Sequence, residues 1–109
     1  MDKKVHMGFR AKDLSSKNSV IVMENGKARN LSLRLDLKDY SSDGIEWGYG
    51  NSGLAQLSLA ILADLTGNDK YAVKHHYWFK SEVIAKMSWN SWKLTAEQIG
   101  NWIRQHHPL

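Results

Sequence analysis

Two stretches in the first half of the chain, residues 5–9 and 31–35, alternate apolar and polar positions with a period of two. Apolar residues occupy every second position over residues 5–9, which is the pattern of a strand with one buried face. Strand-forming residues fill positions 20–23, and a second alternating run covers residues 31–35. Asn25-Gly26 separates these two runs, and this dipeptide is the strongest short signal for a hairpin turn. The pattern therefore predicts a strand and a hairpin within residues 4–47.

The second half of the chain changes to a helical spacing. Apolar residues surround the predicted helix over residues 53–66 on nearly all sides, so we expect it in the middle of the domain. One apolar face is expected for a second helix over residues 69–87 and for a third over residues 95–106. A short strand is expected at residues 45–47. This order predicts an α+β domain in which three C-terminal helices pack on a small antiparallel sheet, made of the N-terminal hairpin plus one or two strands.

Residue types at the helix ends support these boundaries. Gly67 suits the left-handed position that ends the first helix, and Asn68 or Asp69 can cap the second. Thr95 and Gln98 have the spacing of a capping box at the start of the third helix. The segment between the second and third helices holds two Trp residues and is expected to be a loop.

Size and composition limit the kinds of protein that this chain can be. With 109 residues, it has the size of a single domain with one hydrophobic core. There is no cysteine, which excludes disulfides, thiolate catalysis and cysteine-ligated zinc. The N-terminal segment lacks the apolar stretch of a signal peptide, and no apolar run is long enough for a membrane span. We therefore expect a cytoplasmic protein without membrane contact.

The net charge of +4 is spread unevenly along the chain. Residues 1–38 carry nine Lys or Arg against four Asp or Glu, a net charge of +5, whereas residues 39–70 carry one against five, or −4. A basic surface attracts nucleic acid by counterion release, although a solvated surface with a modest excess of Lys explains the same charge. The candidates for a nucleic-acid surface are the cations of the first segment, Arg10, Lys12, Lys27, Arg29 and Arg34.

Gly48, Gly50 and Gly53 spell the G-x-G-x-x-G sequence of dinucleotide-binding turns. That site also needs a second parallel strand after the helix, with an acidic residue near the end of the strand. Here another helix is predicted to follow, and no Lys or Arg lies within the loop. We therefore interpret the glycines as a turn that starts the central helix and lets the backbone pass close to its neighbours. Anion binding at the free N–H groups of the helix start is the weaker alternative.

Aromatic and hydrogen-bonding side chains are dense around these glycines. The residues are Glu46, Trp47, Tyr49, Asn51, Ser52 and Gln56. If they converge, they can bind a base, a sugar or a peptide by stacking and polar contacts. If they do not, the two aromatic residues belong to the core, Ser52 caps the helix, and Gln56 satisfies a buried backbone group. We take the set as the candidate surface for a ligand or partner.

The segment GIEWGYGNSGLAQLSLAILAD, with the later FKSEVIAKM and WKLTAEQIGNWI, carries a family resemblance. It resembles a domain-of-unknown-function family of small bacterial and phage proteins, whose members have E-W-G-Y-G-G-S-G-P-A-Q-L-A-L-A-I-L-A-D at this place. This chain departs from that pattern at Asn51, where Gly is usual, and at Leu54, where Pro is usual. The resemblance implies no activity, and it suggests an accessory or host-interaction role in phages or mobile elements.

The sequence gives weaker indications of a catalytic site or a metal site. Glu46 or a histidine can act as a general base, and Ser52 with His75 or His76 could form a nucleophile and its base. Neither combination has a nucleophile elbow or a third, orienting residue at a recognisable spacing. The pairs His75-His76 and His106-His107 can each easily provide only one ligand to a metal ion, because adjacent side chains on a helix point about 100° apart. We therefore predict no cofactor and no metal site.

The sequence as a whole favours a small binding or interaction module, whose partner is a protein or a small ligand. Its contact surface is predicted in the loop of residues 46–56. The alternative is a weak nucleic-acid-binding protein that uses the basic N-terminal hairpin. A small enzyme with Glu46 or a histidine as general base is the third hypothesis.

Overall fold

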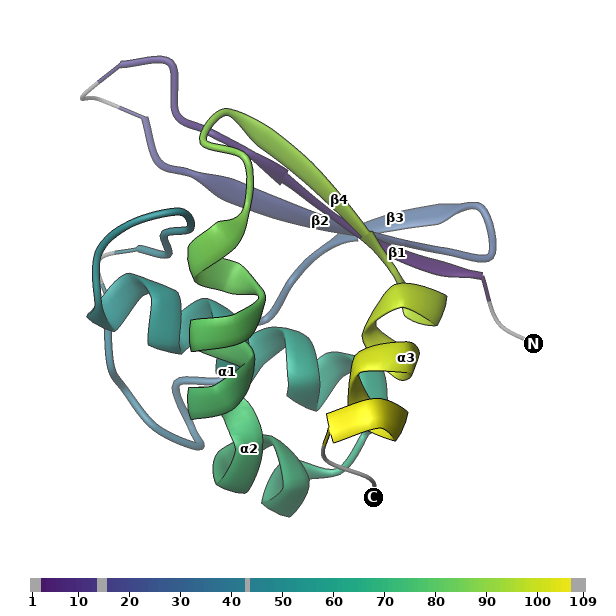
Figure 1. Ribbon diagram of the computed structural model, residues 1–109. Helices are drawn as coiled ribbons and strands as arrows, with labels where there is room; N and C mark the ends of the chain where they lie inside the picture. The colour runs from purple at the N-terminus through teal and green to yellow at the C-terminus, as the bar shows by residue number, and fades with distance from the viewer. Residues whose placement is uncertain (1–2, 14–15, 43, 107–109) are drawn as a thin grey trace.

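In the computed structural model, the helices of the described chain lie on one face of a four-stranded antiparallel sheet (Figure 1). The structure describes residues 3–13, 16–42 and 44–106. The strands are β1 (Lys4–Phe9), β2 (Ser19–Glu24), β3 (Lys27–Asn30) and β4 (Ser91–Thr95), in the spatial order β3-β2-β1-β4. The helices are α1 (Ser52–Thr66), α2 (Asp69–Glu82) and α3 (Ala96–His106), with the 3-10 turn η1 (Ile84–Lys86) after α2. The predicted α+β class is confirmed.

The β2–β3 hairpin turns at the dipeptide that the sequence indicated. Asn25 and Gly26 have φ angles of 52° and 84°, and a two-residue type I′ turn requires positive φ at both positions. β3 ends at Asn30, so the strand expected over residues 31–35 does not form. The reason is local, since Arg34 takes a left-handed conformation with φ 56° and the chain turns away from the sheet.

The two faces of the sheet have different neighbours. The antiparallel register sets His6 opposite Val22 and Gly8 opposite Trp92. These residues face the helices, and the side chains of His6 and Val22 are fully buried. Odd-numbered residues of β1 point to the opposite face, which no helix covers in Figure 1.

α1 runs through the middle of the domain, as its apolar pattern predicted. All residues from 54 to 63 are buried, because the sheet covers one side of α1 and α2 packs along another (Figure 1). None of the helices in the described part of the chain has the length and apolar character needed to cross a lipid bilayer.

The helix caps also match the sequence prediction. Gly67 ends α1 in the left-handed conformation, and the side chain of Asn68 caps α2 by accepting a hydrogen bond from Tyr71 N at 3.0 Å. At the start of α3, Gln98 Oε1 accepts from Thr95 N at 2.9 Å, and Thr95 Oγ1 accepts from Gln98 N at 3.1 Å. The capping box is therefore confirmed.

The short strand expected at residues 45–47 does not form. The backbone of this segment binds side chains instead of a neighbouring strand. Asn18 Nδ2 donates to the carbonyl of Ile45 at 3.1 Å, and Trp47 N donates to the carboxylate of Glu46 at 3.2 Å. These contacts replace hydrogen bonds that a neighbouring strand would otherwise supply to the same two groups.

Two further differences lie between α2 and α3. The predicted loop contains β4, which forms the second neighbour of β1 and places a strand among the helices. Trp92 and Leu94 alternate with polar residues in β4, so the period-two signal is present but short. The helix predicted over residues 69–87 ends at Glu82, and Val83, with φ −119° and ψ −61°, is the C-cap that joins α2 to η1.

Candidate functional site

Arg10 joins segments that are distant in the sequence. It follows β1, and its largely buried guanidinium reaches the loop of residues 45–50 and the turn before β4. Its Nη1 lies 2.8 Å from Glu46 Oε1, its Nη2 donates to the carbonyl of Trp47 at 3.3 Å, and its Nε donates to the carbonyl of Trp89 at 2.6 Å. The planar guanidinium thereby fixes both loops against the end of β1.

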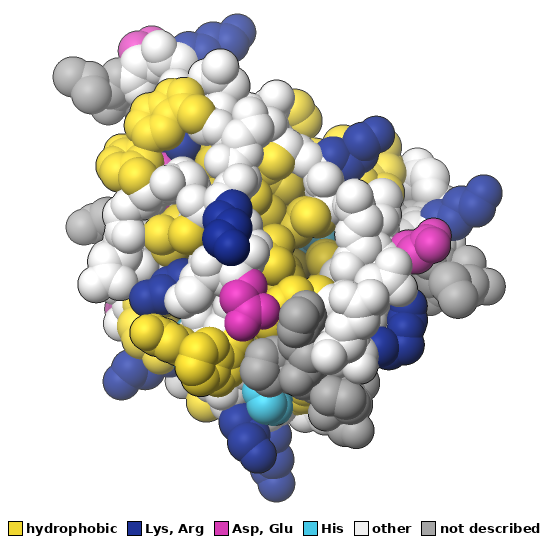
Figure 2. Space-filling model, viewed as in Figure 1, with side chains coloured by type: hydrophobic (Ala, Val, Ile, Leu, Met, Phe, Trp, Pro, Cys, Tyr) yellow, Lys and Arg dark blue, Asp and Glu magenta, His cyan; other side chains and the backbone are white. Residues whose placement is uncertain are grey.

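Tyr49 and Trp89 form an exposed aromatic pair beside this guanidinium. Their rings stack with 4.7 Å between centroids and an interplanar angle of 27°. Arg10 Cζ lies 3.7 Å from the centroid of the Trp89 ring, a cation–π contact that holds the indole in place. Even so, Tyr49 is 52% exposed and Trp89 is 51% exposed. Hydrophobic side chains stand out at the upper left of Figure 2, on the side of the loop that leads into β4.

A pocket of about 650 Å³, here called the polar pocket after the polar side chains in its lining, opens next to Arg10. Its described lining includes Glu46 and several amide and hydroxyl side chains, namely Asn18, Ser41, Asn51 and Ser52. Asp13 and Lys17 add one charge of each sign. Because Arg10 and Glu46 also neutralise each other, the pocket suits neutral hydrogen-bonding groups such as those of a peptide backbone or a sugar.

The three glycines of the loop have backbone roles. Gly48 and Gly50 have φ angles of 77° and 99°, in the region that favours glycine. Gly53 lies against Glu46, since a Cβ at this position would come within 2.9 Å of Glu46 Cβ. α1 is then followed by α2 and not by a strand. The order of elements around the loop therefore differs from that of a dinucleotide-binding fold.

Trp47 and Gln56, two of the six predicted contact residues, lie in the core with no exposed surface. Trp47 Nε1 donates to the carbonyl of Trp89 at 2.9 Å, and its ring meets Trp92 edge to face at 5.5 Å. The amide of Gln56 makes four hydrogen bonds to the segment of residues 33–41. Both side chains pack in the core beneath the loop, and neither lines the polar pocket.

The other four predicted residues reach the surface. Glu46, Asn51 and Ser52 line the polar pocket, and Tyr49 belongs to the aromatic pair. Asn51 precedes α1 but makes no side-chain cap, and its Oδ1 accepts from Lys80 Nζ at 3.2 Å. Ser52 is the first residue of α1 and not its cap.

Trp89 and Arg10 were not among the residues predicted for this loop. Each lies far from the loop in sequence, and only the fold brings them to it. An apolar Trp in a short segment rich in polar residues is the signal that could have pointed to an exposed ring.

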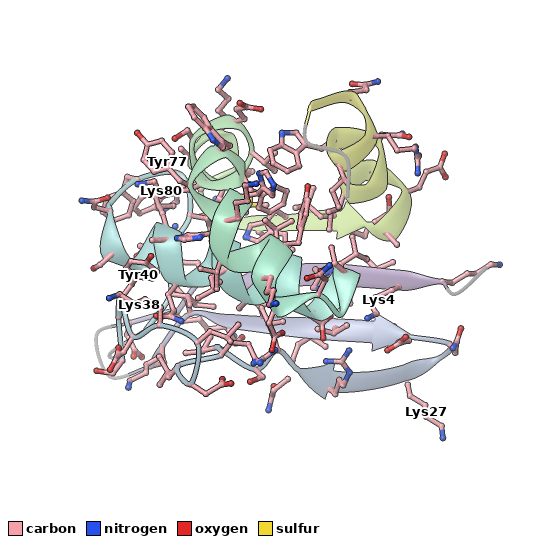
Figure 3. All side chains as sticks on the ribbon, turned by 90° about the horizontal axis from the view of Figure 1, so that it is seen from below. Lys4, Lys27, Lys38, Tyr40, Tyr77 and Lys80 are labelled. Carbon is pink, nitrogen blue, oxygen red and sulfur yellow. The ribbon has the colours of Figure 1, made fainter. Side chains whose placement is uncertain are left out.

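The cations predicted for nucleic-acid binding do not gather on one surface. Arg29 pairs with Asp64 at 2.9 Å, and Arg34 pairs with Asp69 at 2.9 Å. Arg10 is held by Glu46, as described above. Lys12 and Lys27 are exposed, but Lys12 follows the end of β1, whereas Lys27 begins β3 beside the start of β1. Figure 3 shows Lys27 pointing into solvent at the edge of the sheet.

A partly buried ionic cluster, which the sequence did not indicate, lies between the sheet and the end of α1. His6 Nε2 is 2.8 Å from Asp64 Oδ2, and Lys4 Nζ is 3.5 Å from the same oxygen. Arg29 approaches the other carboxylate oxygen. Burial opposes ionisation of Asp64, but the hydrogen bonds from His6 and Arg29 and the charges of His6 and Lys4 lower its pKa to about 2.

The residues proposed as general bases are held by structural contacts. Glu46 Oε1 accepts from Asn18 and from Trp47 N, in addition to Arg10. His76 is buried, with Nε2 2.9 Å from the hydroxyl of Tyr40 and Nδ1 2.8 Å from the carbonyl of Val73. In the part of the chain that the structure describes, no three His, Asp or Glu side chains gather as metal ligands would. His107 lies outside the described residues.

Comparison with known proteins identifies a family for this chain. The model of a family of unknown function, DUF6166, matches residues 8–105 of the chain. A search of curated proteins finds no match, and neither does a search of solved structures. The matched residues begin within β1 and end within α3, so they include the Arg10 contacts, the aromatic pair and the polar pocket.

Proposed function

This chain belongs to DUF6166, a family of unknown function, and we propose from its geometry that it is a binding module for a peptide segment of a partner protein. The contact surface is the aromatic pair of Tyr49 and Trp89 together with the polar pocket beside Arg10. The observation that carries the proposal is the exposed stack of two large rings, held by a largely buried Arg. Trp, Tyr and Arg are the residues most enriched in the energetic centres of protein interfaces.

The chemistry of the site favours a peptide over an ion. The ring faces offer apolar area to a side chain such as proline or leucine. The pocket next to them offers amide and hydroxyl groups that can pair with backbone N–H and C=O groups. Charges of opposite sign accompany each other in the pocket, as in Arg10 with Glu46, so no net charge selects an anion.

The side chains of the site are also preorganised in the absence of a partner. Three bonds from Arg10 fix the backbone or side chains on both sides of the aromatic pair. Gly53 packs tightly on Glu46, which seats the loop on α1. Rings that are already ordered lose little conformational entropy on binding, and this raises affinity.

Photo-crosslinking tests this proposal at a single position. Tyr49 is replaced by benzoylphenylalanine in the full chain, and Tyr77, which is exposed to a similar degree on α2, receives the same replacement as a control. We expect a light-dependent adduct with a partner protein from position 49 and not from position 77. The crosslinked segment, identified by mass spectrometry and synthesised, should bind wild type at least about tenfold more tightly than Trp89→Ala. Identical adducts from both positions, or no adduct at 49, would overturn the proposal.

A second candidate, single-stranded nucleic acid, is supported by cations that lie beside aromatic rings. Lys80 Nζ lies 4.9 Å from the centroid of the Tyr77 ring, and Lys38 Nζ lies 6.0 Å from that of Tyr40. Figure 3 shows both pairs on the same side of the molecule. Fluorescence anisotropy with labelled oligo-dT and oligo-U is expected to show binding that falls steeply with salt and weakens in Lys80→Ala. Absence of binding at low salt removes this candidate.

The phage or mobile-element setting suggested by the sequence belongs to the same proposal. An accessory protein acts by engaging a component of the host, and an exposed, preorganised contact surface serves that role. The crosslinking experiment addresses it directly when it is performed in cells that encode the chain, because the captured segment then comes from a protein present there.

A further inference from the structure

The sheet has a second face that no helix of the described chain covers (Figure 1). The register assigns strand residues to this outer face, because directly opposed residues of antiparallel strands point the same way. The apolar ones are Val5, Met7, Phe9, Ile21, Met23 and Ala28. The polar ones are Ser19, Asn30, Ser91, Lys93 and Thr95. Apolar residues thus form the middle of the face, in β1 and β2.

This composition differs from that of a solvent-facing sheet. When one face of an antiparallel sheet packs on the core and the other meets water, the outer positions are polar. Here Phe9 is 47% exposed and Met23 is 38% exposed, and the three apolar residues between them are partly exposed. A contiguous apolar patch of this kind on a small domain marks an interaction surface.

The described strands place a positive charge on the outer face. Lys93 pairs with Met7 in the register, so its ammonium group stands beside the apolar middle of the face. The described strands place no carboxylate there, since Glu24 lies opposite Lys27 on the helix side, near Lys4 and Arg29. A partner therefore gains an ion pair by offering a carboxylate at the edge of its own apolar surface.

We propose that the outer face of the sheet binds an amphipathic helix of a partner protein, with an acidic side chain beside the apolar stripe of that helix. The size of the face supports a helix. Strands of six residues give a length of roughly 20 Å, which equals about 13 helical residues. On its other face the same sheet already packs against α1, so a bound partner helix would leave both faces of the sheet covered by helices.

A second copy of the chain fits this face less well. Four strands at about 4.8 Å spacing and a length of roughly 20 Å give a footprint of about 400 Å². A stable dimer buries about 800 Å² on each subunit, roughly twice that area. Two copies would also bring together two Lys93 side chains, and the described strands offer neither of them a carboxylate on this face.

This inference is independent of the proposed peptide site. The side chains of Arg10, Tyr49 and Trp89 and the polar pocket belong to the helix side of the sheet, and the outer face holds none of them. Substitutions on one surface can therefore leave the other intact, and failure of either proposal can be recognised separately.

The test is a peptide selection on the immobilised full chain. The probe is a display library of helical peptides of about 20 residues. We expect wild type to enrich peptides with apolar residues at helical spacing and Asp or Glu beside them. Lys93→Glu is expected to reverse the charge preference to Lys or Arg, whereas the control Lys86→Glu, on η1, keeps the wild-type preference. Met7→Glu is expected to lower recovery at least about tenfold.

Several outcomes would overturn the proposal. These are no enrichment on wild type, the same peptides on wild type and Lys93→Glu, or enrichment that depends on Trp89 and not on Met7. Light scattering provides a further check, since a wild-type dimer that becomes a monomer in Met7→Glu would make a second copy the occupant. Lys93 is exposed, so Lys93→Glu tests the proposal even where Met7→Glu lowers stability.

Discussion

Gly8 lies beneath the indole ring of Trp92, its direct partner across β1 and β4. A Cβ at position 8 would come within 2.3 Å of ring atoms, and aromatic rings that fold over a cross-strand glycine are a known way to pin strand register. Gly8→Ala is expected to destabilise the fold by about 2 kcal/mol, because the ring must move out of a packed core. Urea denaturation followed by circular dichroism measures this change.

The matched control is another glycine. Gly100 lies inside α3, where a Cβ would meet only the end of the flexible Arg104 side chain, at 3.3 Å. Gly100→Ala is therefore expected to be neutral or to stabilise by up to about 1 kcal/mol. In a Trp92→Ala background, Gly8→Ala should lose most of its effect. Equal destabilisation in both backgrounds would show that the ring is not the cause.

Gln56 is expected to be among the most sensitive polar residues. Its Oε1 accepts from the N–H groups of Tyr40 and Ser41, and its Nε2 donates to the carbonyls of Leu33 and Lys38. Gln56→Leu keeps the volume but leaves these four backbone groups without a partner. We expect a loss of about 3 kcal/mol in the free energy of unfolding, measured by urea denaturation.

The control for Gln56→Leu is the same substitution at an exposed glutamine. Gln105 lies on the outer side of α3, and Gln105→Leu is expected to change the free energy of unfolding by less than about 0.5 kcal/mol. Hydrogen exchange should show the loop of residues 33–41 opening in Gln56→Leu and not in Gln105→Leu. A loop that stays protected in both variants contradicts the anchoring role.

Local signals predicted the parts of this fold that depend on neighbours in sequence. The Asn25-Gly26 turn, the all-round apolar pattern of α1 and the capping box of Thr95 and Gln98 all formed as expected. β4 was missed because its identity depends on a partner strand from the other end of the chain. A strand of five residues carries little periodicity of its own.

In the candidate site, too, the sequence identified features that depend on residue type and missed those that depend on tertiary contacts. Residue types identified the loop around Tyr49 as rich in aromatic and hydrogen-bonding side chains. They do not distinguish an amide that binds a ligand from an amide that binds backbone groups. Gln56 was therefore predicted as a contact residue although it is buried. Trp89 was omitted because its stacking on Tyr49 is a tertiary contact. The role of Arg10 as a link between loops likewise exists only in the folded chain.

Asp64 is expected to make stability depend on pH in the acid range. Burial opposes its ionisation, yet its bonds to His6 and Arg29 lower its pKa in the folded state from 3.8 to about 2. Since the folded pKa lies below the unfolded value, the ionised carboxylate contributes stability that is fully present above about pH 4 and is lost as pH falls through about 2. Urea midpoints measured between pH 5 and pH 2 should fall more for wild type than for Asp64→Asn.

Asp36 is the control for this pH dependence. A hydrogen bond from Arg34 lowers the pKa of Asp36 as well, but its side chain is 65% exposed, so solvent screens the interaction. Asp36→Asn is expected to leave the acid transition close to that of wild type. If Asp64→Asn and wild type lose stability in parallel between pH 4 and pH 2, Asp64 is not the group responsible.

Arg10→Lys is expected to loosen the aromatic pair while keeping the charge. A lysine ammonium can remain near Glu46, but it lacks the planar group that bonds two loops and stacks on Trp89 at the same time. We expect a loss of about 2 kcal/mol in stability and broadened or shifted NMR signals of the Trp89 indole and the Tyr49 ring. Arg104→Lys, an exposed substitution on α3, should leave both unchanged. Weaker binding to a partner segment in Arg10→Lys, with Tyr49 and Trp89 themselves intact, would show that preorganisation by Arg10 contributes to recognition.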